Sequence, residues 1–469
     1  MQRDRETSIL RDDLAMVIDA GQRLGADYVE ARAQRLLQTT ITMKDSRVEA
    51  VKKGTEIGSA IRVFVEGAWG FASLGTFEKH SLTDSIAEAY KMAKAASLQV
   101  KTSSKLADCK AVEAKVAINP KKDPRTVSTK EKIDFLSAED RTIFDYDAHI
   151  RSCTINYLDI AQTDYFMNSE GAFIEQDKLY IYLVSVATAK EADRLTLSHD
   201  LLGYTSGFEE FDKETPEVIG RRVAKRAIDQ LKAKEPKGGT FPVVVGPKVI
   251  GVFAHEAFGH LAEADLTLSG SVLIDKLGKK VASEIVSIYD DGTMSGAFGS
   301  FKYDDEGVPV QKTTLIKNGK ITGFMHNRET AQKFGVKPTG NARAQDFRFE
   351  PIIRMRNTYL ARGDYSFEEL LEDIKFGYYI KNYRGGQANL DGTFQVGVQE
   401  AFEIVNGKLG APVRNLSFSG NTLETLHKVD AVGKDFELSV GVCGKDQNAF
   451  VGAGGPHTRV KEVLIGGRA

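Results

Sequence analysis

A chain of 469 residues is long for one compact core and suggests two folded domains. Hydrophobic residues make up 42% and charged residues 27%, which is the mixture of a globular protein rather than a disordered or fibrous one. With 63 basic and 65 acidic residues and no long block of either sign, the chain lacks the charge pattern of proteins that bind nucleic acids or membrane surfaces.

The N-terminal segment and the cysteines predict a cellular location. The first residues contain no apolar stretch long enough for a signal peptide, and no apolar run elsewhere is long enough to cross a bilayer. The cysteines, Cys109, Cys153 and Cys443, are odd in number and widely spaced, which favours reduced thiols over a disulfide framework. We therefore expect a cytoplasmic protein in which Cys109 and Cys153 are small buried hydrophobic residues.

Helical and β-rich segments alternate in the first half of the chain. Apolar residues at helical spacing predict an amphipathic helix that ends at Gly25, and short β-rich runs over residues 28–74 predict an antiparallel sheet. Further helices are expected over residues 81–98, from Ser128 onward, and from Pro216 to Leu231. Two β-rich runs, 149–160 and 178–190, flank a turn at 168–171 and predict a further sheet region.

A polar segment with proline and glycine, residues 232–240, separates this half from a second, β-dominated half. We place the domain boundary near Lys237, which gives domains 1–236 and 237–469. Helices are expected in the second domain near residues 247–262, 326–334 and 366–374. The predicted fold class is α+β, with helices packed on an antiparallel sheet in the first domain and a mostly-β second domain.

One segment of the second domain carries the pattern of a metal site. Residues 242–265 read as a buried strand, a turn at Gly246 and a helix that contains the sequence HEAFGH, from His255 to His260. Histidine followed by glutamate resembles the H-E-x-x-H zinc motif, in which Glu256 would activate water as a general base. The alternative is a helix with one surface histidine and one satisfied core histidine.

The spacing of this motif is one residue too long for a regular helix. Residues i and i+5 are displaced by about 140° around a helix axis, so two ligands at these positions cannot converge. We therefore expect a π-type distortion at Phe258 and Gly259, or a helix that ends before His260. Gly259 would ease either distortion, because glycine tolerates unusual backbone conformations.

A catalytic zinc ion typically takes three protein ligands and leaves a fourth position for water. Glu263 or Asp265 would complete a site of two histidines and a carboxylate, whereas Cys443, in a glycine-flanked loop, would give two histidines and a thiolate. The residues alone leave this choice open.

Several segments in a fixed order make the chain resemble the TldD/PmbA (TldD/TldE) family of metalloproteases. HEAFGHLAEAD resembles the family's metal helix, and VCGKDQNAFVGAGGPHTRV resembles its cysteine-bearing C-terminal loop. The segments between them occur in the expected order at 304–331, 338–345, 354–364 and 385–408. One position departs from the family pattern, because Asp446 stands where a glycine is expected.

The resemblance implies the roles of the site residues. It implies zinc held by His255, His260 and Cys443, with Glu256 as the catalytic general base. It also implies the catalytic, TldD-type subunit, because the metal-less PmbA or TldE partner lacks the H-E-x-x-x-H segment. The domain over residues 237–469 would then be the metallopeptidase domain, and the domain over residues 1–236 would serve substrate access and dimerisation.

The resemblance further implies hydrolysis of short or unfolded peptides inside a homodimer or a heterodimer with a metal-less paralogue. In the mechanism we expect, Glu256 deprotonates a metal-bound water that attacks the peptide carbonyl, and then protonates the leaving amine. Arg343 and His457 could help to stabilise the oxyanion, but a structural role is the simpler expectation for both. Two alternatives are a zinc amidohydrolase of a small amide and a non-catalytic subunit with a structural zinc.

Overall fold

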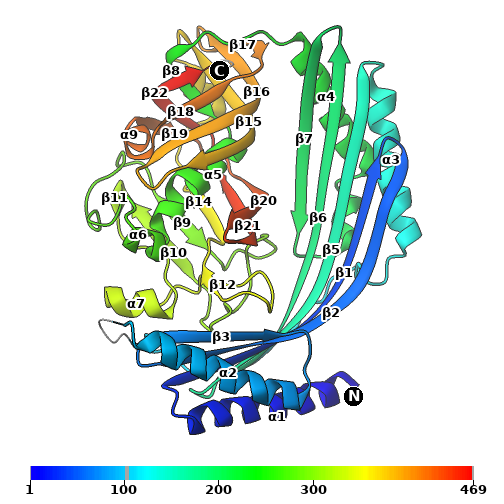
Figure 1. Ribbon diagram of the computed structural model, residues 1–469. Coiled ribbons are helices and arrows are strands. Elements are labelled where there is room, and N and C mark those ends of the chain that lie inside the picture. The colour runs from blue at the N-terminus through cyan, green and yellow to red at the C-terminus, as the bar shows by residue number, and fades with distance from the viewer. Residues whose placement is uncertain (1, 101–104, 467–469) are drawn as a thin grey trace.

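The computed structural model describes residues 2–100 and 105–466. It has the expected α+β class, with helices and strands distributed over both halves of the chain (Figure 1). The helices are α1 (Gln2–Arg23), α2 (Lys79–Ser97), α3 (Thr129–Tyr146), α4 (Pro216–Lys232), α5 (Pro247–Val252), α6 (Ala264–Leu268), α7 (Arg328–Phe334), α8 (Phe367–Leu371) and α9 (Thr422–His427).

A long, curved sheet forms the body of the first half (Figure 1). Its strands lie in the order β3-β2-β1-β5-β6-β4, and β7 also pairs with β6. All neighbours are antiparallel except β4 and β6. The strands are β1 (Tyr28–Lys44), β2 (Arg47–Val65), β3 (Ala68–Leu74), β4 (Glu113–Val116), β5 (Ile150–Asn168), β6 (Phe173–Glu191) and β7 (Arg194–Tyr204).

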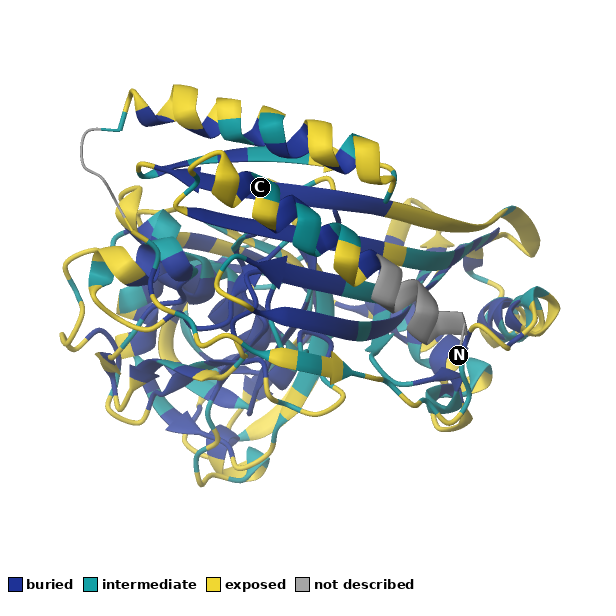
Figure 2. Ribbon diagram, turned by 90° about the horizontal axis from the view of Figure 1, so that it is seen from below, coloured by how far each residue is buried: buried dark blue, intermediate teal, exposed yellow. Residues whose placement is uncertain are grey.

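The sequence-based picture of two separate groups of short strands is wrong. The structure has one sheet, in which β1 pairs with β5 from Glu30 opposite Asn168 to Lys44 opposite Thr154. The polar pair Lys53-Gly54, which resembles a turn, lies inside the exposed part of β2. Because residues 47–57 are mostly exposed on both faces, as the yellow end of this long strand shows (Figure 2), they carry no apolar alternation that would mark a strand.

Helices cover the long sheet at both ends. Leu14 of α1 and Ile86 of α2 pack on Val29 of β1 in one core cluster. Leu136 of α3 and Val223 of α4 belong to a second cluster, which covers the far part of the sheet. Ser128 caps α3 by accepting a hydrogen bond from the backbone N–H of Glu131, and Thr215 caps α4, so the predicted starts of both helices are confirmed.

The second half contains two larger sheets and a small one. One sheet has the order β11-β10-β9-β14-β21-β20, the other has the order β15-β8-β22-β18-β16-β17 with β19 on β22, and β12 pairs with β13. The strands are β8 (Gly239–Val245), β9 (Ile288–Asp291), β10 (Lys312–Lys317), β11 (Lys320–Ile321), β12 (Ala342–Arg343), β13 (Ile352–Ile353), β14 (Asn357–Leu360), β15 (Phe376–Ala388), β16 (Thr393–Val405), β17 (Lys408–Val413), β18 (Ser417–Asn421), β19 (Val429–Val432), β20 (Glu437–Lys445), β21 (Gln447–Gly455) and β22 (Thr458–Gly466).

The helix of the HEAFGH segment lies between these two larger sheets, where α5 packs against β15 on one side and β21 on the other. The helices expected near 247–262, 326–334 and 366–374 are present, whereas the short helices α6 and α9 were not predicted. No helix in residues 2–100 and 105–466 is both long and apolar enough to span a membrane. The division into domains 1–236 and 237–469 stays a prediction.

Candidate metal centre

The HEAFGH segment changes helix type within a few residues. After α5, residues Phe253–Gly259 form a π-helix and His260–Ala262 form a 3-10 turn. The N–H of His260 donates to the carbonyl of His255, which is the i to i+5 hydrogen bond of a π-turn. The predicted π-type distortion is therefore confirmed, although it begins at Phe253 and extends over the whole motif.

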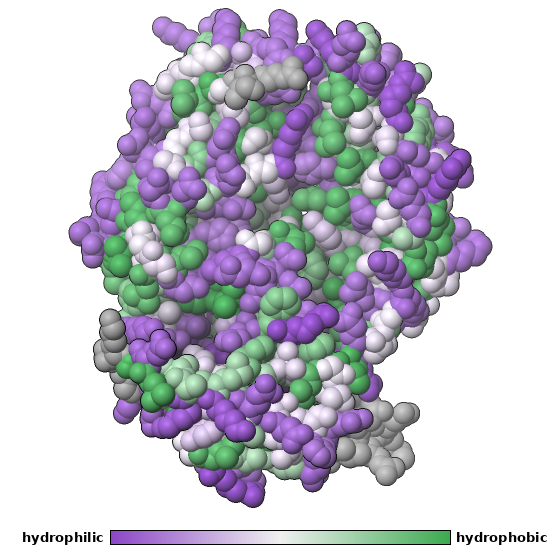
Figure 3. Space-filling model, in the orientation of Figure 1, coloured by the Kyte–Doolittle hydropathy of each residue, from purple (hydrophilic) through white to green (hydrophobic). Residues whose placement is uncertain are grey.

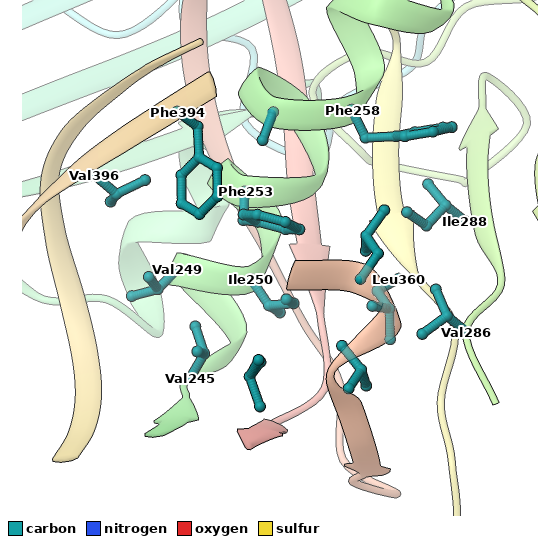
Figure 4. Close-up of a cluster of buried hydrophobic side chains, with 14 of the residues drawn as sticks. Val245, Val249, Ile250, Phe253, Phe258, Val286, Ile288, Leu360, Phe394 and Val396 are labelled. Atoms are coloured by element: carbon teal, nitrogen blue, oxygen red, sulfur yellow. The ribbon is translucent and has the colours of Figure 1, made fainter. Parts of the chain in front are cut away.

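The π-turn brings the two histidines together. Its wider turn places residues i and i+5 on one face, and the imidazole centroids of His255 and His260 lie 5.2 Å apart with an interplanar angle of 81°. The other face of the helix is anchored in the core by Phe253 and Phe258, beside Val249 and Ile250 (Figure 4). Burial of these apolar side chains thus stabilises the π-helix, which is otherwise a rare type of helix.

The prediction that Gly259 is needed for an unusual backbone conformation is wrong. Its backbone is ordinary right-handed helix, with φ −57° and ψ −50°. A Cβ atom at this position would lie 2.1 Å from Sδ of Met355. Glycine is therefore needed here for close packing rather than for an unusual backbone conformation.

Cys443 reaches the histidines from the far end of the sequence. It lies on β20, opposite Ala449 of β21, in a hairpin whose turn residue Asp446 has the left-handed φ of 57°. A glycine adopts this conformation more readily, which explains the glycine expected there from the family pattern. The Sγ atom lies 3.3 Å from Nε2 of His260, and one donor atom from each of His255, His260 and Cys443 lies within 4.8 Å of the others.

The buried Arg354 and the partly buried Lys445 connect the hairpin to the rest of the site. The Arg354 guanidinium is 1% exposed and donates to the backbone carbonyls of Gln447 and Cys443, on both strands of the hairpin. The ammonium of Lys445 lies 3.2 Å from a carboxylate oxygen of Glu263 and 2.7 Å from one of Asp265. The position of the thiol therefore depends on contacts between segments distant in sequence.

Glu263 orients His260 rather than joining the cluster. Its carboxylate lies 2.9 Å from Nδ1 of His260, which leaves Nε2 to face Cys443. Asp265 is bound to Lys445. The group of converging donor atoms thus contains Cys443 and the two histidines, and neither Glu263 nor Asp265 belongs to it. The orienting role of Glu263 was missed in the sequence, although its position three residues after His260 is a usable signal.

The electrostatics of the cluster favour a thiolate. Burial alone raises the pKa of Cys443, but the imidazoles of His255 and His260 outweigh it and lower the pKa to about 4. Burial alone lowers the pKa of His260, but Glu263 and Cys443 outweigh it and raise the pKa to about 10. A thiolate is the form of cysteine that binds metals.

The donor set fits a zinc ion. His255 is 3% exposed, and neither of its ring nitrogens has a hydrogen-bond partner among the described residues. Buried polar nitrogens without partners are costly, and a metal ion would satisfy one of them. Two imidazoles and one thiolate form a known type of catalytic zinc site.

Glu256 lies at the edge of the cluster. One of its carboxylate oxygens is 3.8 Å from Nε2 of His260, and its side chain is 30% exposed. It is therefore open to solvent beside the donor atoms, as a general base requires.

The two other candidates have structural partners elsewhere. Arg343 donates to the carbonyls of Met355 and Phe450, and the imidazole of His457 contacts Asp435 and Tyr379. Neither belongs to the group of converging donors.

An α+β scaffold that brings together two histidines and a cysteine, with a partly exposed carboxylate beside them, has the donor set of a zinc enzyme. Models of the PmbA/TldA metallopeptidases match residues 29–97 (domain 1), 122–231 (central domain) and 238–467 (C-terminal domain). The chain belongs to this family, the TldD/PmbA metallopeptidases.

Relatives and solved structures agree with this assignment. The chain is 41% identical to a metalloprotease of Methanothermobacter thermautotrophicus, over 94% of this chain and 96% of that protein. It is 34% identical to the zinc metalloprotease TldD homolog of Saccharolobus solfataricus, over 96% of this chain and 99% of that protein. The crystal structure of TldE from Thermococcus kodakarensis shares the fold, with a TM-score of 0.75 and 22% identity over 97% of this chain and all of that chain.

Proposed function

We propose that this protein is a zinc-dependent metallopeptidase that hydrolyses short or unfolded peptides, with His255, His260 and Cys443 as ligands. The observation that carries the proposal is the convergence of these donors within 4.8 Å, with the Glu256 carboxylate beside His260. When bound, zinc acidifies water and polarises a carbonyl group. Glu256 accepts the proton of the attacking water and returns it to the leaving amine.

The number of donors favours a catalytic over a structural role for the metal. Structural zinc sites are closed by four protein ligands, whereas catalytic sites use three. Within residues 2–100 and 105–466, the group that could hold an ion contains His255, His260 and Cys443 alone.

A free strand edge near Glu256 favours peptides over small amides. In the described chain, β15 pairs with β16 over its whole length but with β8 only at Tyr378–Ile380. Its second edge therefore carries no strand from Lys381 onward. A Cβ atom at Gly386, on this free part, would lie 3.5 Å from Cγ of Glu256. An extended peptide that added a strand here would pass the general base.

The assembly is part of the proposal. We propose that the active form is a dimer, formed with a second copy of this chain or with a metal-less paralogue of the TldE type. Residues 1–236 would serve dimerisation and substrate access. The shared fold of TldE supports a partner of this kind. The cytoplasmic location stays a prediction.

The direct test uses an unstructured peptide and three proteins: wild type, Glu256→Gln and Cys443→Ala. We expect zinc-loaded wild type to cleave the peptide. Glu256→Gln should retain zinc and lose at least about 100-fold in rate, because general-base catalysis typically contributes 10²–10⁴-fold. Cys443→Ala should lose both zinc and activity. Cleavage at the wild-type rate by Glu256→Gln would remove the general base from the proposal.

A further inference from the structure

A cavity of about 450 Å³ lies between the long sheet and the hairpin that carries Cys443. Tyr180 and Tyr182 of β6 line it on one side, and Val442 and Phe450 of the hairpin line it on the other. Val442 and Phe450 face each other in the ladder one residue away from Cys443, so they point to the opposite face of the hairpin. None of His255, Glu256, His260 and Cys443 lines the cavity, although Ala449, the ladder partner of Cys443, does. On the face drawn in Figure 3, the molecule is hollowed between its C-terminal half and the long strands.

One part of the cavity wall is aromatic. The ring of Tyr180 lies 4.5 Å from that of Phe450 and 5.7 Å from that of Phe301, measured between centroids. Leu158 and Ile160 of β5 extend this wall. Such a surface accommodates a flat or branched apolar group of a ligand.

Two buried arginines form another part of the wall. Arg343 donates to the carbonyls of Met355 and Phe450, both at 2.7 Å. Arg356 donates to the carbonyls of Gly340 at 2.6 Å and Gly299 at 3.3 Å. Within the described chain, neither guanidinium forms an ion pair with a carboxylate, and Nη2 of Arg356 is buried without any hydrogen-bond partner.

The acidic groups of the cavity already have partners. Asp305 lies 3.3 Å from the ammonium of Lys178, and Asp346 pairs with Arg348 at 2.9 Å. Asp304 accepts the backbone N–H groups of Val308 and Ala342, and Glu56 lies 3.1 Å from Arg348. Burial and the neighbouring Arg343 lower the pKa of Arg356 to about 10, although the nearby Asp304, Asp290 and Asp305 act in the opposite direction. The guanidinium is therefore charged at neutral pH, and it forms no direct ion pair within the described chain. An unpaired buried donor of this kind is costly unless a ligand satisfies it.

We propose that this cavity binds a small carboxylate with an apolar or aromatic body. The carboxylate accepts hydrogen bonds from the Arg356 and Arg343 side of the cavity, and the body packs among Tyr180, Phe301 and Phe450. Charge-assisted bonds from guanidinium groups to carboxylates are among the strong hydrogen bonds of proteins. The volume is within the usual range for small-molecule sites. Both a free organic acid and the C-terminal residue of a peptide offer this chemistry. The proposal does not depend on zinc or on Glu256.

The test compares 3-phenylpropionate with its uncharged isostere 3-phenylpropanamide, by calorimetric titration into the full-length Glu256→Gln protein. We expect the acid to bind at least about tenfold more tightly than the amide, because only the acid pairs with the guanidinium groups. A peptide ending in phenylalanine, with a free or an amidated C-terminus, distinguishes the two sources. Binding of the free-ended peptide identifies a peptide terminus, and binding of the small acid alone identifies a free acid.

Two variants locate the site. Arg356→Gln should abolish the difference in affinity between acid and amide. Ala344 also lines the cavity, so Ala344→Leu adds volume to the wall and should weaken the binding of both ligands. Arg125→Gln is the matched control, because Arg125 lies on the surface beside Asp123. This variant should bind the acid and the amide with the affinities of the parent protein. Thermal unfolding and zinc content establish that each variant is folded. If Arg356→Gln does not fold, Ala344→Leu and the comparison of acid with amide decide the outcome.

Three results would overturn the proposal. The first is equal affinity for acid and amide in the parent protein. The second is unchanged binding in folded Arg356→Gln and Ala344→Leu. The third is loss of acid binding when zinc is removed, which would place the acid at the metal centre instead.

Discussion

The cluster is assembled from two regions of opposite character, the π-helical segment Phe253–Gly259 and the hairpin β20–β21. The helix carries two donors within six residues, and its distortion follows from local spacing and from apolar anchors beside it. The hairpin carries one donor, Cys443, which lies 183 residues beyond His260 in the sequence. Contacts of Arg354 with the hairpin and of Lys445 with Glu263 position this donor beside the histidines. Local geometry thus pairs the histidines, whereas tertiary contacts complete the site.

The largest effect is expected from removing the distant donor. Cys443→Ala should lower zinc affinity by more than the roughly 10–100-fold that loss of a supporting partner costs, because one of the three ligands is gone. Zinc content after dialysis measures this effect. The buried Cys153→Ala is the control and should retain zinc. Full zinc occupancy in Cys443→Ala would assign the third ligand to another residue.

The supporting contacts of the hairpin should have an intermediate effect. Lys445→Met removes the link between hairpin and helix, and Glu263→Gln weakens the orientation of His260, so each should lower zinc affinity by roughly 10–100-fold. A competition titration with a zinc chelator measures these affinities. Lys428→Met, at an exposed pair with Glu462, should behave as wild type. If Lys445→Met also bound zinc as wild type does, the hairpin would need no such link.

The helix should be sensitive to packing at Gly259. Gly259→Ala should lower the free energy of unfolding by about 1–3 kcal/mol, because the new methyl group overlaps Sδ of Met355. Chemical denaturation measures the change, and Met355→Ala in the same chain should restore part of it. Gly54→Ala, where a Cβ would meet no atom within 4 Å, is the control. Equal stability of Gly259→Ala and wild type would contradict the packing argument.

The zinc-free protein should keep its metal-binding geometry but show a different pH dependence of alkylation at two of its thiols. The pKa of Cys443 is lowered to about 4, so its thiolate persists from about pH 5 to 8 and its alkylation rate should be nearly constant there. Burial raises the pKa of Cys109 to about 11, so its rate should rise about tenfold per pH unit. Mass spectrometry after iodoacetamide treatment reports both rates. A rate at Cys443 that also rose tenfold per unit would contradict the lowered pKa.

The sequence predicted the local half of the site better than the distant half. The i to i+5 spacing of His255 and His260 predicted either a π-type distortion or a helix that ends before His260, and the structure has the π-type distortion. The choice of the third ligand among Glu263, Asp265 and Cys443 could not be made from spacing. It depends on the contacts that Arg354 and Lys445 make between distant segments.

In the fold, too, local features were predicted and contacts between distant segments were not. Helix starts at Ser128 and Thr215 carry local capping signals and were predicted. The pairing of β1 with β5 was not predicted, because it joins segments that lie more than 100 residues apart in the sequence. Where β2 is exposed on both faces, no hydrophobic alternation marks it as a strand.

The central claim is that the helix and the hairpin together bind one zinc ion, and X-ray absorption at the zinc edge of the loaded protein tests it most directly. We expect one sulfur ligand at about 2.3 Å, two imidazole nitrogens at about 2.0–2.1 Å and one further oxygen that is not from the protein. Cys443→Ala should remove the sulfur signal. A spectrum without sulfur, or one with four protein ligands, would contradict the account.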